Sequence, residues 1–174
     1  MQSKSRLIYF IEYSGLFILL LFASLVYLGQ EMVSLFFNSD GLAAVLLFKD
    51  LLIEHGHYKD WVIPSVGHFF PSMPIFSLIF LIVKNVYLYF LIAMWMIIIA
   101  MYFAVKLIYS QYFSTRNSTL CALIVTTGIF LLAFSAGSLY NILLLPFYHV
   151  EEFIVGIFLL GIQINLLNKD KFTY

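Results

Sequence analysis

Acidic and imidazole side chains gather in one segment of this chain, which is otherwise strongly apolar. The segment runs from Glu31 to about Pro74 and follows the first long apolar run. Carboxylates and imidazoles are the groups that proteins use to move protons and to hold divalent metal ions. Chemistry on a water-facing surface is therefore expected from this set: Asp40, Asp50, Glu54, His55, His57, Asp60 and His68.

Asp40 lies early in this segment, within the stretch FNSDGLAAVLLFKDLL at residues 37–52. A helix that begins here could use Asn38, Ser39 or Asp40 as its N-cap, because these side chains accept hydrogen bonds from unpaired backbone N–H groups. A negative side chain at this point also suits the helix dipole. Helix capping is thus one reading of Asp40, and a chemical role is the other.

A helix through this stretch would carry a narrow acidic edge on an apolar surface. At about 100° per residue it places Asp40 and Glu54 on one face, with Asp50 about 80° from Asp40. Such a helix suits the membrane interface, where it lies in the membrane plane with its acidic edge toward water or packed protein. Asp40 is then expected at the outer boundary between water and lipid, where a lipid-linked phosphate group would also lie.

The composition is that of an integral membrane protein. Hydrophobic residues make up 63% of the chain and charged residues only 10%, and the mean hydropathy is +1.01. Soluble domains carry about 25% charged residues. The formal net charge of zero gives no basis for nucleic acid as a partner, because that requires a clustered basic face. The bilayer is therefore the partner that the composition predicts.

Runs of about 20 apolar residues, the length that crosses the hydrocarbon as a helix, predict an all-α bundle in one membrane domain, 1–174. The segment 74–84 is too short for a full span and is either a re-entrant piece or part of a fifth span. The predicted spans are 7–30, 86–109, 120–138 and 150–167, with an outer loop at 31–73.

Basic residues favour four spans over five, because Lys and Arg concentrate on the cytoplasmic side. With four spans, six basic residues lie inside and three outside, and a fifth span reverses these numbers. The six are Lys4, Arg6, Lys106, Arg116, Lys169 and Lys171, and the three are Lys49, Lys59 and Lys84. We therefore expect both ends in the cytoplasm and the first loop outside, in a bacterial inner (plasma) membrane.

Three further polar features have a structural and a functional interpretation. Glu12 in the first span is expected near the inner interface, in reach of water or of Lys4 and Arg6. Glu54, His55 and His57 could hold a divalent cation, but a solvated loop is the preferred interpretation. Trp61 is most simply an anchor at the membrane interface.

The order of these features resembles the start of the GT-C class of multi-spanning membrane glycosyltransferases. The resemblance covers about residues 7–110: a first span, an acidic residue soon after it, an interfacial helix, and the stretch KDWVIPSVGHFFPSMP leading into further spans. GT-C enzymes transfer a sugar from a polyprenyl-phosphate or polyprenyl-diphosphate donor to an acceptor on the outer face. An acidic residue of their first outer loop is the general base or metal-contacting group, and Asp40 matches it. The resemblance thus implies Asp40 as catalytic, with Asp50, Glu54 and His68 as substrate-binding residues around it.

Two features depart from the family pattern. Many members carry a second acidic residue beside the first, whereas Gly41 follows Asp40 here, and members usually have eight or more spans. The resemblance therefore implies the N-terminal part of such an enzyme, a split subunit or a decayed gene product. The alternative is a non-enzymatic membrane protein whose outer loop docks onto another membrane subunit.

Overall fold

The computed structural model describes residues 2–29, 39–61, 72–135 and 150–170, and every regular element within these ranges is a helix. Four of the helices are long and apolar enough to cross a membrane. They are α1 (Gln2–Tyr27), α5 (Val86–Tyr109), α6 (Thr115–Ser135) and α8 (Val150–Asp170). The predicted all-α bundle of an integral membrane protein is confirmed.

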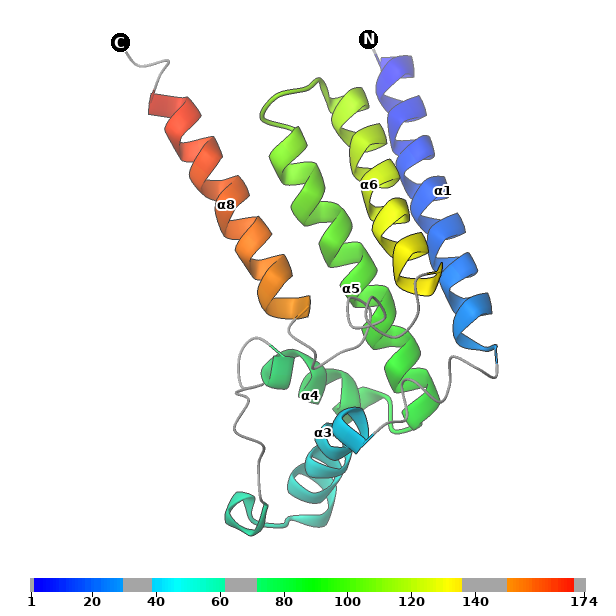
Figure 1. Ribbon diagram of the computed structural model, residues 1–174, viewed down its shortest axis with the longest axis vertical. Coiled ribbons are helices and arrows are strands. Elements are labelled where there is room, and N and C mark those ends of the chain that lie inside the picture. The colour runs from blue at the N-terminus through cyan, green and yellow to red at the C-terminus, as the bar shows by residue number, and fades with distance from the viewer. Residues whose placement is uncertain (1, 30–38, 62–71, 136–149, 171–174) are drawn as a thin grey trace.

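The four long helices run alternately up and down. The helix α5 packs against each of the other three. Figure 1 shows α1 and α6 on one side of α5 and α8 on the other. The helix α5 begins after Asn85, whose side chain accepts a hydrogen bond from the Leu88 N–H at 3.1 Å. Gly161 lets α8 approach closely, since an added Cβ would lie 2.8 Å from Leu107 of α5.

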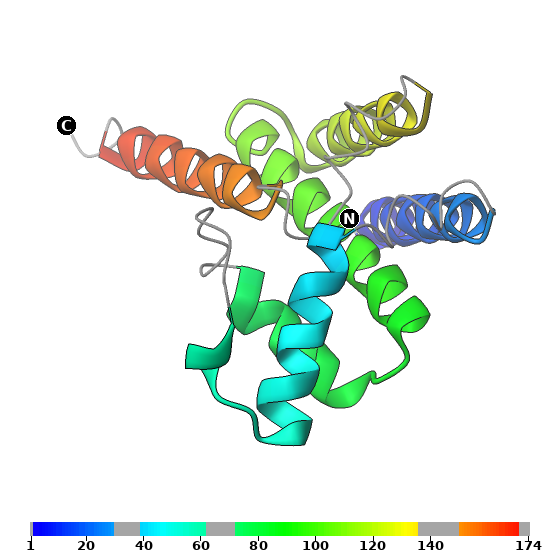
Figure 2. The same ribbon diagram turned by 60° about the horizontal axis from the view of Figure 1, so that its bottom comes forward.

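The two ends of the bundle differ in what they carry. At one end lie the start of α1, the end of α8 and the turn at residues 110–114 that joins α5 to α6 (Figure 1). We call this the turn end. The opposite end, called the α3–α4 end, carries α3 (Ser39–Lys49) and α4 (Ser72–Ile82). Figure 2 shows these two shorter helices beneath the long ones, side by side.

Aromatic rings join the shorter helices to α5. The ring centroids of Phe48 in α3 and Phe80 in α4 lie 6.2 Å apart, and Phe80 in turn lies 5.9 Å from Tyr89 of α5. Phe76 of α4 meets the same tyrosine ring at 6.5 Å. These rings are buried, so α3 and α4 form a packed layer on the bundle.

The helix α4 covers most of the segment 74–84, for which the sequence allowed either a re-entrant piece or part of a fifth span. Its 11 residues extend about 16 Å at 1.5 Å per residue, which is about half of the hydrocarbon thickness. Both α4 and the start of α5 lie at the α3–α4 end (Figure 1). In the described part of the chain, four helices are long and apolar enough to cross a membrane, and α4 is shorter than these.

Candidate functional site

Asp40 is the second residue of α3, at the α3–α4 end of the bundle. The helix begins at Ser39, so the predicted helix start is present, while the Asp40 side chain and Asn38 lie outside the part that the structure describes. His68 also lies outside the described residues. The structure therefore places the Asp40 backbone in the first turn of α3.

Asp50 follows directly on α3 and opens the π-helical turn η1 (Asp50–Glu54). Its Oδ2 accepts a hydrogen bond from Trp61 Nε1 at 2.5 Å. The Gly56 N–H donates to the Asp50 backbone oxygen at 3.0 Å, and a Cβ on Gly56 would lie 2.3 Å from either carboxylate oxygen. Asp50 therefore closes a loop that brings Trp61 back to the end of α3, and Trp61 has a specific hydrogen-bond partner beyond its predicted anchoring role.

Glu54 does not continue the face of Asp40 as the helical projection predicted. The projection assumed a uniform α-helix, but η1 has the wider π-helical turn, and His55 ends it in the left-handed conformation with φ of 57°. Glu54 instead pairs with Lys49, with Nζ and Oε1 2.7 Å apart and both side chains about half exposed. The hydrogen bond that Lys49 donates to the Glu54 carboxylate raises the pKa of Lys49.

The candidate residues at this end do not converge on one point. Asp40 and Asp50 lie about 15 Å apart along the helical run, at 1.5 Å per residue. Among the described residues, no three acidic, histidine or cysteine side chains lie close enough together to hold a metal ion. Glu54, His55 and His57 therefore do not form the cation site that the sequence left open. Asp40 is thus separated from Asp50 and Glu54, each of which has its own partner.

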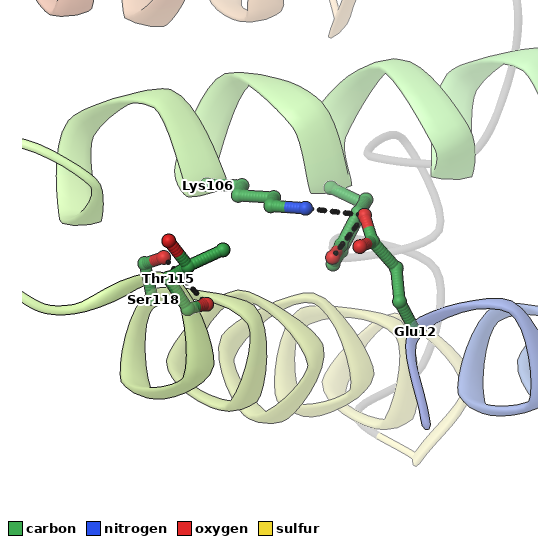
Figure 3. Close-up of polar contacts among 5 residues, drawn as sticks. Glu12, Lys106, Thr115 and Ser118 are labelled. Atoms are coloured by element: carbon green, nitrogen blue, oxygen red, sulfur yellow. Dashed lines mark hydrogen bonds and ion pairs between the residues drawn. The ribbon is translucent and has the colours of Figure 1, made fainter. Parts of the chain in front are cut away.

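A second group of ionisable residues lies inside the bundle, toward the turn end. Glu12 of α1 is only 5% exposed. Its Oε1 accepts a hydrogen bond from the Tyr102 hydroxyl at 2.9 Å, and the same oxygen forms an ion pair with the Lys106 ammonium. Figure 3 shows Lys106 reaching from α5 toward Glu12. The Lys106 ammonium also lies 5.6 Å from the centre of the Tyr102 ring. We call these three residues the buried cluster.

The predicted setting of Glu12 was wrong. It was expected at the interface with water or with Lys4 and Arg6, but its carboxylate is buried against α5. Neighbouring positions along the chain suggested Lys4 and Arg6, whereas the true partner comes from the antiparallel helix 94 residues away. One sequence pattern could have predicted this pair: an acidic residue lies in one span, and a basic residue lies near the same end of another span. Unlike charges inside a membrane pair with each other.

A cavity of about 190 Å³ lies between α4, α5 and α8. Its walls are apolar side chains, among them Phe76, Ile97 and Phe158, and the one carboxylate on its wall is Glu151. Glu151 lies in the first turn of α8 and is 7% exposed. The Glu151 side chain at the start of α8 is therefore packed into the bundle.

Comparisons with protein-family models, with curated proteins and with solved structures found no match to this chain. Its function must therefore be argued from the arrangement of its own residues.

Proposed function

We propose that this chain is a GT-C-like membrane glycosyltransferase module, which handles a polyprenyl-phosphate-linked sugar at the α3–α4 end of the bundle. The order of its elements supports this proposal. Within the described residues, a first long helix is followed by two short α-helices packed at one end of the bundle, and then by three more long helices. The observation that carries the proposal is the position of Asp40, in the first turn of the first of these short helices.

The reaction needs a carboxylate close to the membrane surface. The acceptor hydroxyl or amide attacks the anomeric carbon of the donor sugar, the bond to the polyprenyl phosphate breaks, and the acceptor proton moves to a base. A carboxylate within hydrogen-bond reach of the acceptor performs this role. The donor phosphate lies at the boundary between water and lipid, and Asp40 belongs to a helix at one end of the membrane-crossing bundle (Figure 1).

The partners of Asp50 and Glu54 favour Asp40 over these two residues as the base. Asp50 is held by Trp61 and packed against Gly56, and Glu54 is paired with Lys49. We therefore assign Asp50 to shaping the loop after α3. Glu54 and His68 remain our candidates for contact with the donor or acceptor.

The basic residues support an orientation for this module. Arg6 and Arg116 lie toward the turn end, in the first turns of the α1 span and of α6, and Lys106 is in the last turn of α5. Positive side chains near span ends concentrate on the cytoplasmic side. The turn end therefore faces the cytoplasm in our proposal, and the α3–α4 end faces the outside of a bacterial inner membrane.

The test is sugar transfer by Asp40→Asn in membranes supplied with a panel of polyprenyl-phosphate-linked hexoses. Asparagine caps a helix about as well as aspartate, so the fold should be kept. Loss of a general base lowers the rate by about 10²- to 10⁴-fold. The control is Asp60→Asn, which removes an exposed carboxylate from the 3-10 turn η2 (Tyr58–Asp60).

Equal transfer by Asp40→Asn and the unaltered chain would overturn the proposal. It would shift the weight to the alternative, in which the chain is a non-enzymatic subunit of a membrane assembly. Repeating the assay with a chelator separates two roles for Asp40. Transfer that persists without divalent cations supports a general base, and transfer that is lost supports contact with a metal ion.

A further inference from the structure

Polar side chains join α1 to α5 at several depths of the membrane. The Tyr27 hydroxyl donates to the Tyr87 backbone oxygen at 2.9 Å, near the α3–α4 end. Deeper in the bundle, Trp95 Nε1 donates to Ser24 Oγ at 3.0 Å. The buried cluster follows toward the turn end. We call this set of contacts the polar seam; its members are Glu12, Ser24 and Tyr27 of α1 with Tyr87, Trp95, Tyr102 and Lys106 of α5.

The contacts of the polar seam follow a single antiparallel register. From Tyr27 back to Glu12 along α1, the partners on α5 advance from Tyr87 to Lys106. At 1.5 Å per residue the seam extends about 22 Å, which is most of the hydrocarbon thickness. The contacts therefore all specify the same axial position of α1 against α5.

Apolar packing alone specifies this position weakly. Lipid tails are as apolar as leucine, so a helix that slides along its neighbour exchanges one set of apolar contacts for another. A slide of one turn, about 5.4 Å, would separate Glu12 from Lys106 and leave two charges without partners in hydrocarbon. Fixing the register of helices is the best-attested use of buried polar and ionic groups.

The axial position of α1 matters at the α3–α4 end. The chain passes from the end of α1 to the start of α3 within residues 28–38, while Phe48 and Phe80 join α3 through α4 to α5. Both attachments of α3 thus lead to α5, one through α1 and one through the aromatic rings. A shift of α1 therefore moves one of the two attachments of α3, whose first turn contains Asp40.

We propose that Glu12, Tyr102 and Lys106 are positioning residues, which set the register of α1 against α5 and thereby hold Asp40 in place. The effect on sugar transfer rests on the function proposed above, whereas the effect on register does not. A displacement of a catalytic group by about 1 Å can cost about 100-fold in rate. The two effects are therefore measured separately.

Register is measured by pulsed electron resonance between spin labels on the protein in lipid nanodiscs. Suitable sites are Phe10→Cys near the turn end and Leu88→Cys near the α3–α4 end, in a Cys121→Ser background, because Phe10 and Leu88 are 71% and 52% exposed. An axial shift of α1 changes this diagonal distance directly. The control is Ser118→Ala, since the buried Ser118 hydroxyl donates a hydrogen bond within its own helix α6, to the Thr115 oxygen at 3.0 Å.

The main variant is Glu12→Leu/Tyr102→Phe/Lys106→Met, which replaces the buried cluster by apolar side chains of similar size. We expect a displaced or broadened distance, by up to about one helical turn of 5.4 Å. We expect Ser118→Ala to keep the original narrow distribution, and the swap Glu12→Lys/Lys106→Glu to restore it. An unchanged distance in the triple variant would overturn the proposal.

Two further readouts keep the proposal falsifiable. If the triple variant does not fold, Glu12→Gln replaces it, and an unchanged distance there overturns the register role. In the transfer assay we expect the triple variant to lose tenfold or more and Ser118→Ala to lose nothing; a triple variant that is displaced but fully active overturns the link to Asp40. Absence of transfer by the unaltered chain would count against the proposed function alone, because the spin-label distance does not depend on it.

Discussion

The charged residues of this protein occupy two contrasting environments. Glu12 and Lys106 lie inside the bundle, with side chains 6% and 20% exposed, and are joined to each other and to Tyr102. Lys49 ends α3 and Glu54 ends η1, with side chains 53% and 51% exposed. Both pairs are ion pairs in geometry. Only the first has lost its water, so only the first can strongly constrain the fold.

This contrast separates residues that hold the molecule from residues that can meet a substrate. A desolvated pair has little freedom, because removing either member leaves an uncompensated charge in hydrocarbon. An exposed pair is worth little and exchanges easily with water or ligand. Asp50 belongs with the residues that hold the molecule, despite its place near the surface, because Trp61 and Gly56 enclose its carboxylate.

The largest expected effect breaks the buried pair. Lys106→Met leaves the Glu12 carboxylate buried with Tyr102 as its remaining partner, and breaking a buried pair costs about 3–5 kcal/mol. The measurement is the free energy of unfolding in mixed detergent micelles. Lys49→Met is the matched control and should unfold at the same denaturant concentration as the unaltered chain. Equal losses in the two variants would remove the distinction between the two environments.

A medium effect is expected where a glycine makes room for a carboxylate. Gly56→Ala would force Asp50 to turn away and leave the Trp61 indole N–H without its acceptor, at a cost of about 1–3 kcal/mol. The loss should appear in the unfolding free energy and in the near-ultraviolet dichroism of tryptophan. Gly128→Ala is the control, because an added Cβ there meets nothing within 4 Å. It should stabilise α6 by up to about 1 kcal/mol. A neutral Gly56→Ala would show that the loop closes without Asp50.

The smallest effect concerns the exposed pair and its dependence on pH. The hydrogen bond and charge of Glu54 raise the pKa of Lys49 above its ordinary value of 10.5. A raised pKa means that the folded state favours the charged lysine, so the contribution is complete below pH 10.5 and is lost as the pH rises through the folded value. Nuclear magnetic resonance titration of the lysine side chains should show the pKa of Lys49 falling in Glu54→Gln. A Lys49 pKa that is the same in both proteins would exclude the ion pair in solution.

The long helices were predictable because a bilayer demands about 20 apolar residues in a row. The predicted span 86–109 coincides with α5, Val86–Tyr109. The start of α6 was expected at 120 but lies at Thr115, since hydropathy does not register helical turns made of polar residues such as Arg116 and Asn117. Apolar runs therefore locate helices in the membrane, and their ends need hydrogen-bond geometry.

The candidate site was less predictable, because its details depend on local backbone geometry and on contacts between distant residues. A uniform helical projection aligned Glu54 with Asp40, and the π-helical turn at Asp50 ended that alignment. The pairing of Glu12 with Lys106 required the register of two antiparallel helices. The start of a helix close to Asp40 was predictable, because capping residues are read locally.

The α3–α4 end and the turn end should face opposite sides of the membrane, and side-specific thiol labelling can measure this. In a Cys121→Ser background, single cysteines replace Asp60, Lys84 and Tyr112, which are all exposed. A membrane-impermeant maleimide is applied to sealed, oriented vesicles. We expect cysteines at 60 and 84 to react from one side and the cysteine at 112 to react from the other. Reaction of the cysteine at 84 from the side opposite to that at 60 would mean that α4 crosses the membrane, and would contradict this arrangement.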